Sequence, residues 1–259
     1  MTLQVEVASR TDPGVIRSLN EDSIAADAAL GAVVVADGLA VNRGAEIAAE
    51  ITTSVILQRL RETPRNAPTD ALEGAIASAH RAIRIRASAE PVLDGMGATF
   101  VAVVFRDQGL AVAHVGDARL YRFRDGQLDC LTVDHSFVQE QLARGAVTEE
   151  EARMSKSRNL VTRALGVAEE AHAEVAEHET REGDLYLLCT DGLHELVDHD
   201  DIAAALDVLG SNIELAADSL IKIAKDRGGR DNISVSVVRV GSGDAGRKRG
   251  VLDSLFGRR

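Results

Sequence analysis

The stretch GAVVVADGLAVNRG, from Gly31 to Gly44, decides the architecture of this chain. Its run of small and β-branched apolar residues ends at Asp37, and a glycine follows. The pattern recurs in DLYLLCTDG, where the carboxylate is Asp191, and nearly recurs in LAVAHVGDAR, where it is Asp117. Apolar runs of this kind favour buried strands, and a partly buried carboxylate must be paired, hydrogen-bonded or bound to a cation. The question is therefore which of these partners the carboxylates at the strand ends have.

Composition narrows the class of protein. The chain has 259 residues, of which 45% are hydrophobic, so it is long enough to bury one large core or two small ones. The formal net charge of −12 argues against a nucleic-acid partner, which needs basic patches. The N-terminus lacks the pattern of a signal peptide, and no apolar run approaches the ~20 residues of a transmembrane helix. Two cysteines form no disulfide framework, which favours a cytoplasmic location.

The order of strand-like and helix-like segments predicts an α+β fold with mostly antiparallel sheets. Two short helices are expected within 135–153, broken at Gly145, with Thr148 as the N-cap of the second. A hairpin is expected over 121–131, with Asp125-Gly126 at its tip. The remaining strands are expected over 3–9, 32–36, 98–105, 110–115, 185–190 and 232–240, and the longer helices over 44–62, 70–90, 198–210 and 212–229.

The end of the chain changes in character. Residues 241–259 carry five Lys or Arg and two Asp, and the glycine-rich start of this stretch is typical of a flexible linker. We therefore expect a domain over 1–240 and a flexible basic tail over 241–259. The tail is either disordered or a docking peptide for an acidic partner or membrane surface.

The chemistry of the carboxylates points to hard cations. A glycine after the aspartate permits a tight bend and leaves a backbone carbonyl accessible, and such all-oxygen sites suit Mg²⁺ or Mn²⁺. Zinc has no support, because the sequence contains neither a CxxC nor an HExxH motif. A single Asp-Gly after an apolar run is more often a turn with a capping aspartate, so the motifs must be weighed together.

Taken together, eight motifs over about residues 5–240 resemble the metal-dependent Ser/Thr protein phosphatase family of the 2C type (PPM), in its bacterial form. They occur in the order SRTDPGVIRSLNEDSI, VVVADG, DGMGATFVAVV, VGDARLYRFRDGQL, TVDHSFVQEQLARGAVTEEEAR, RNLVTRALG, LYLLCTDGL and GGRDNISVSVV. The resemblance implies a four-layer α-β-β-α sandwich, in which two mostly antiparallel sheets are flanked by helices. It also implies two Mn²⁺ or Mg²⁺ ions at one end of that sandwich.

The resemblance also implies the metal ligands. Asp37 matches the bridging carboxylate, and Gly38 matches a backbone oxygen ligand. Asp191 and Asp231 match the other coordinating aspartates. Asp117 matches an aspartate that binds a third metal together with Asp191 in bacterial members.

Four further residues match supporting positions of the family. Glu21 matches an acidic residue that reaches the second metal through water, and Asp22 supports it. Arg17 matches the guanidinium that holds the substrate phosphate, a task for which its planar fork is suited. Asn232 matches a group that orients the turn at Asp231.

The stretch after the first Asp-Gly departs from the family pattern. Asn42 stands where the family has a histidine that is thought to protonate the leaving alkoxide, and an amide cannot donate that proton at neutral pH. A weak rate on phosphoserine and a measurable rate on aryl phosphates are therefore expected. Among the histidines present, His114 is expected in the core, and His135 at a helix cap or on the surface.

The resemblance implies hydrolysis of phosphoserine and phosphothreonine in proteins by a metal-activated water, opposing a bacterial Ser/Thr kinase. The expected partners are that kinase and its substrates. Two alternatives stay open at this point. One is a low-activity or degenerate phosphatase that acts as a phosphoprotein-binding scaffold. The other is an unrelated metallohydrolase, which the absence of a P-loop disfavours.

Overall fold

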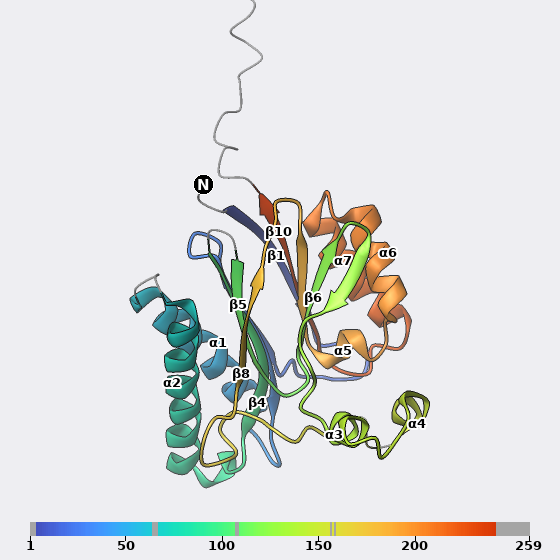
Figure 1. Cartoon of the computed structure of the whole chain (residues 1–259). Helices are drawn as coiled ribbons and strands as arrows, with labels where there is room; N and C mark the ends of the chain where they lie inside the picture. Colours follow the sequence, from blue (N-terminus) through green and yellow to red (C-terminus); the bar gives the residue numbers. More distant parts are fainter. Residues whose placement is uncertain (1–3, 64–66, 107–108, 156, 158, 242–259) are drawn as a thin grey trace, which may run out of the picture.

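Two five-stranded antiparallel sheets form the centre of the computed structural model, which describes residues 4–63, 67–106, 109–155, 157 and 159–241 (Figure 1). The first sheet has the order β1 (Gln4–Asp12), β10 (Ile233–Gly241), β9 (Leu185–Cys189), β6 (Arg119–Arg124) and β7 (Gln127–Cys130). The second has the order β2 (Asp22–Asp27), β3 (Ala32–Leu39), β4 (Gly97–Arg106), β5 (Gly109–Val115) and β8 (Glu174–Glu179).

The central strands are buried on both faces, which explains their continuous apolar runs. In β3, Val33 and Val35 pack in the core between the sheets, against side chains such as Leu188. The alternate residue Val34 points to the other side and packs with helices α1 (Ala45–Glu62) and α2 (Pro68–Ala89). Period-two alternation thus divides one apolar segment between two cores.

Helices cover the outer face of each sheet, which confirms the predicted four-layer α-β-β-α sandwich. Helices α1 and α2 cover the second sheet, and α6 (His199–Leu209) and α7 (Ile213–Asp226) cover the first (Figure 1). The short helix η1 (Pro91–Leu93) leads from α2 to β4. None of the helices within the described ranges is both long and apolar enough to cross a bilayer.

The region expected to hold two short helices does so, with α3 (Phe137–Ala143) and α4 (Glu149–Met154) on either side of Gly145. Thr148 caps α4 in a reciprocal capping box, in which Glu151 accepts from the Thr148 backbone N–H. The β6–β7 hairpin turns at Asp125 and Gly126, which have φ values of 53° and 77° and are suited to a tight hairpin.

Four elements were not expected from the sequence: β2, β8, the short helix η1 and the four-residue helix α5 (Asp191–His194). Both strands lie at edges of the second sheet and contain no buried residue, so neither carries a continuous apolar run. Helix α5 begins at Asp191, the expected metal-binding aspartate. The tail lies outside the described residues except for Gly241, which ends β10.

Candidate functional site

Strand register brings the predicted aspartates to one end of the sandwich. Asp22, the first residue of β2, pairs directly with Asp37 near the end of β3. Asp117 follows β5 by two residues. In the other sheet, Cys189 at the end of β9 pairs with Val235 in β10, so residues 191 and 231 lie just beyond the same end. The loop after β1 and helices α3 to α5 lie at this end of the molecule (Figure 1).

The carboxylates at this end are close enough to perturb one another. Burial, and then the negative charges of Asp22 and Asp191, raise the pKa of Asp37 well above its usual range. Burial, and then the charges of Asp117 and Glu195, do the same to the pKa of Asp191. These side chains therefore form one electrostatically coupled cluster rather than separate capping groups.

Asp22 connects the two sheets within this cluster. Its Oδ2 accepts a hydrogen bond of 2.9 Å from the Thr190 hydroxyl, which in turn accepts from the Ser234 backbone N–H at 3.1 Å. Its Oδ1 is buried and has no hydrogen-bond partner within the described residues. Burial raises the pKa of Asp22 to about 6. Thr190, the last residue of an apolar run, was not singled out from the sequence.

The segment after β1 carries Arg17 and Glu21 to the same place. The Arg17 guanidinium donates to Asp231 Oδ2 at 2.7 Å and lies 3.9 Å from Glu21 Oε2. The Asn232 side chain anchors this segment, because its Oδ1 accepts from the Glu21 backbone N–H at 2.7 Å and its Nδ2 donates to the Leu19 carbonyl at 2.9 Å. Asn232 thus fixes the position of both acidic and basic groups beside Asp231.

The glycine after each aspartate is required by close backbone packing rather than by an unusual φ. A Cβ on Gly38 would lie 2.0 Å from the Ala45 carbonyl oxygen, and a Cβ on Gly192 would lie 1.9 Å from the Asn232 carbonyl oxygen. Neither glycine has a positive φ, so the expected tight bend is not their reason. The Gly38 N–H donates to the Glu21 carbonyl at 3.1 Å, which joins β3 to the Arg17 segment.

The Asp117 turn is held from two sides by histidines. The Gly116 N–H donates to Nδ1 of His135 at 3.1 Å, and Nε2 of His194 donates to the Asp117 carbonyl at 2.9 Å. Burial, and then the charge of Asp134, raise the pKa of Asp117 to about 7. The expectation that His135 caps a helix or lies on the surface is wrong, because its side chain is buried behind this turn.

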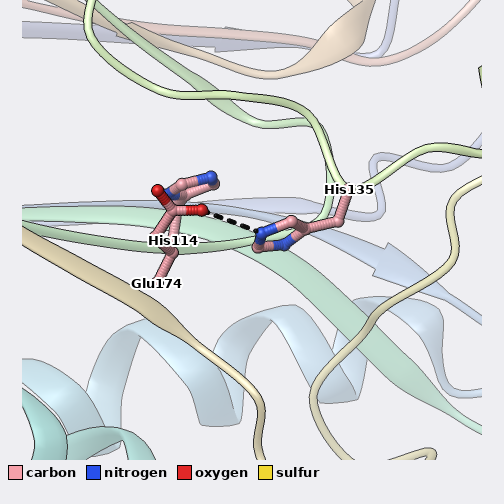
Figure 2. Close-up of side chains that lie close together, drawn as sticks. All are labelled: His114, His135 and Glu174. Atoms are coloured by element: carbon pink, nitrogen blue, oxygen red, sulfur yellow. Dashed lines mark ion pairs between the residues drawn. The ribbon is translucent and has the colours of Figure 1, made fainter. Parts of the chain in front are cut away.

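His135 belongs to a second cluster, with His114 and Glu174 (Figure 2). The two rings stack with centroids 4.7 Å apart, and His135 Nε2 lies 3.5 Å from Glu174 Oε2. His114 is buried as expected, and its Nε2 donates to the Val133 carbonyl at 2.9 Å. His135 Nδ1 accepts from the Gly116 N–H, whereas its buried Nε2 has no hydrogen-bond partner within the described residues. His135 thus supports the Asp117 turn through Nδ1, and the three side chains of the cluster each bring one potential ligand atom within 4.8 Å of the others.

Asn42, which is expected to stand where the family has a histidine, is exposed in the connection between β3 and α1. The other predicted site residues, by contrast, lie at the end of the sandwich where the contacts above join them. The structure brings together Arg17, Glu21, Asp22, Asp37, Gly38, Asp117, Asp191, Asp231 and Asn232.

Comparison with known proteins places this geometry among phosphatases. A family model described as protein phosphatase 2C matches residues 17–220. The serine/threonine protein phosphatase PstP of Mycobacterium tuberculosis is 35% identical over 252 residues, which cover 97% of this chain and 48% of that protein. This chain therefore spans about half the length of that relative.

A shorter relative and a solved structure match over most of their own length. The serine/threonine phosphatase stp of Listeria welshimeri is 33% identical over 238 residues, which cover 88% of this chain and 93% of that protein. The catalytic domain of PstP, solved in complex with two manganese ions, superposes with a TM-score of 0.85 at 34% identity. That match covers 93% of this chain and 100% of the solved one.

Proposed function

This chain belongs to the protein phosphatase 2C family, and from that premise we propose that it hydrolyses phosphoserine and phosphothreonine in proteins with the help of Mn²⁺ or Mg²⁺. The observation that carries the proposal is the coupled cluster of partly buried carboxylates, with Arg17 beside it. Clustered negative charges in a buried site cost free energy unless cations neutralise them.

The residues present fit divalent cations. The donor set consists of carboxylate and backbone oxygens, which Mg²⁺ and Mn²⁺ prefer, and one buried oxygen of Asp22 has no partner within the described part of the chain. The manganese in the PstP catalytic domain supports the same choice here. We assign two ions to Asp37, Gly38, Asp191, Asp231 and Glu21, and a third to Asp117 together with Asp191.

The side chains around the cations bind and orient the phosphoryl group. When bound, the cations supply an activated water and offset charge on the phosphoryl oxygens. The Arg17 guanidinium is half-exposed, and its planar N–H groups can donate to two phosphate oxygens at once. Its ion pair with Asp231 keeps the guanidinium beside the carboxylate cluster. The hydrogen bond from Thr190 holds the Asp22 carboxylate in position. The hydrogen bond from Asn232 to the Leu19 carbonyl holds the segment that carries Arg17 beside Asp231.

The departure at Asn42 sets the substrate preference within this reaction. An amide has no proton to donate to a departing serine alkoxide at neutral pH. A phenolate leaves without such a proton. We therefore propose that this protein hydrolyses aryl phosphates faster than phosphoserine.

A metal-dependence assay tests the proposal. Purified protein is incubated with p-nitrophenyl phosphate or a phosphothreonine peptide, in Mn²⁺, Mg²⁺ or excess EDTA. Hydrolysis should need the cation and should fall at least ~100-fold in Asp191→Asn, because a coordinating charge is lost. The matched control is Asp207→Asn on exposed α6, which should keep full activity. Equal hydrolysis by Asp191→Asn and the wild type would contradict the assignment.

The wider assignments belong to the same proposal. We assign the phosphatase to residues 1–240 and infer that it opposes a Ser/Thr kinase, with that kinase and its phosphorylated substrates as partners. Its two cysteines are free, which supports a cytoplasmic location, where thiols stay reduced. We also propose that the basic tail, residues 241–259, docks a partner; residues 242–259 lie outside the described part of the chain.

A further inference from the structure

Large apolar side chains are exposed on the segment that carries Arg17. Val15, Ile16 and Leu19 keep 60%, 70% and 52% of their surface in contact with solvent. Single exposed apolar residues are ordinary, but three within five consecutive residues concentrate exposed apolar side chains on one short segment. We call residues 15–19 the apolar loop.

The exposure of the apolar loop is imposed by its backbone. The Val15 N–H donates to the Gly229 carbonyl at 2.7 Å, and the Leu19 carbonyl accepts from Asn232 Nδ2 at 2.9 Å. Just before the loop, the Pro13 carbonyl accepts from the same amide nitrogen at 3.1 Å. Since both ends are tied to the turn around residues 229–232, the side chains cannot turn inward without breaking these bonds.

The position of Arg17 relates this apolar surface to the reaction. Arg17 is the middle residue of the loop, and its guanidinium lies 2.7 Å from Asp231 in the candidate site. A phosphoryl group held by Arg17 brings the residues on either side of the phosphorylated side chain next to the loop. In an extended peptide those residues are spaced by about 3.3 Å each, so they remain within reach of side chains next to Arg17.

The charged groups beside the loop already have partners. Asp12 accepts from Lys225 Nζ at 2.7 Å, and Arg17 pairs with Asp231. A peptide therefore gains most at the loop from apolar contacts, because apolar residues beside the phosphorylated residue would displace water from Val15 and Ile16.

We propose that the apolar loop is a substrate-recognition surface that selects phosphorylated segments with apolar residues directly beside the phosphoserine or phosphothreonine. This inference rests on the proposed phosphatase function and adds the class of substrate. It requires no movement of the loop, because the surface is already exposed and its backbone is already fixed.

Two phosphopeptides test the proposal, identical except for leucine or serine on both sides of one phosphothreonine. Partial burial of two leucines predicts a kcat/KM about 10-fold higher for the leucine peptide than for the serine peptide. Most of this difference should be a lower KM. In the double variant Val15→Ser/Ile16→Ser this ratio should fall to about 2. Because the readout is a ratio within one protein, a general loss of activity in the variant cancels.

The matched control is Val208→Ser on α6, which removes a valine that is 74% exposed away from the loop. It should keep the wild-type ratio. Equal kcat/KM for the two peptides in the wild type, or an unchanged ratio in the double variant, would overturn the proposal. Absence of metal-dependent hydrolysis of both peptides and of p-nitrophenyl phosphate would instead refute the phosphatase function itself.

A second copy of this chain is the competing occupant of the loop. Sedimentation of the wild type and the double variant at assay concentration decides between them. Monomers in both cases agree with a substrate surface. A wild-type dimer that the double variant loses would assign the loop to a contact between copies and would overturn the proposal.

Discussion

The partly buried carboxylate cluster makes the stability of the metal-free protein depend on pH in an unusual direction. The pKa is raised from 3.8 to about 6 at Asp22 and from 3.8 to about 7 at Asp117, both chiefly by burial. A raised carboxyl pKa means that the folded state holds its proton more tightly than the unfolded state. The free energy of unfolding is therefore not reduced at a pH below the pKa of the carboxyl groups in the unfolded chain. It falls as pH rises, and the full reduction is reached above about pH 7.

The size of this effect follows from the two pKa values. Each pKa unit corresponds to about 1.4 kcal/mol, so ionising both groups costs at most about 7 kcal/mol and roughly 3 kcal/mol once solvent penetration is allowed for. For a domain of this length, roughly 3 kcal/mol corresponds to a fall in Tm of about 10 °C. Bound Mn²⁺ should remove most of that fall, because the cations neutralise the charges that cause it.

Thermal unfolding followed by circular dichroism between pH 5 and 7.5 measures the effect, in excess EDTA and in Mn²⁺. The Tm in EDTA should fall across this range, and Asp117→Asn should reduce the fall by about half. Asp207→Asn on α6 serves as the control for a change in net charge and should leave the slope unchanged. A wild-type Tm that is flat or rises with pH in EDTA, with the same profile in Asp117→Asn, would refute the reasoning.

Three further changes test other parts of the molecule. Asn42→His should raise kcat on a phosphoserine peptide about 10-fold or more and leave p-nitrophenyl phosphate nearly unchanged; equal effects on both substrates would show that position 42 does not supply the missing proton. His135→Phe removes the acceptor of the Gly116 N–H and should raise the Mn²⁺ concentration for half-maximal activity about 10-fold. His135→Asn should restore part of this loss. Equal Mn²⁺ requirements in the two variants would rule out a positioning role for His135. Arg124→Met leaves the buried Asp184 carboxylate unpaired and should lower the free energy of unfolding by about 3 kcal/mol in a urea titration, whereas a loss below about 1 kcal/mol would contradict a buried pair.

The sequence predicted the features that depend on local pattern. The run before Asp37 reads as a buried strand because every residue from Ala32 to Ala36 is buried in the structure. The N-cap at Thr148 was likewise predicted from consecutive residues, and the structure adds the reciprocal bond from Glu151. Asp37, Asp117 and Asp191 stood out because they end apolar runs, whereas Asp22 and Asp231 were identified only through the resemblance to the phosphatase family.

The features that escaped prediction depend on partners far away in the chain. Strand β8 lies at an edge and contains no buried residue, so it does not show the apolar run of a central strand. Thr190 binds Asp22, which lies 168 residues away, and His194 binds the Asp117 carbonyl, 77 residues away. Local periodicity carries no information on such pairs, and the same limit explains why His135 was expected near the surface.

The cluster also joins the two halves of the fold. Asp22 and Asp37 belong to one sheet, whereas Asp191 and Asp231 follow and precede strands of the other. The hydrogen bond from Thr190 to Asp22 is a direct polar link between the sheets at this end. Cations held by carboxylates of both sheets would add links at the point where like charges otherwise push the sheets apart. A cation at 100 times its dissociation constant contributes about 2.7 kcal/mol, close to the roughly 3 kcal/mol that the ionised cluster costs near neutral pH. Cation loading would therefore restore stability and assemble the reaction site in one event, so a metal-starved protein should become both inactive and easier to unfold.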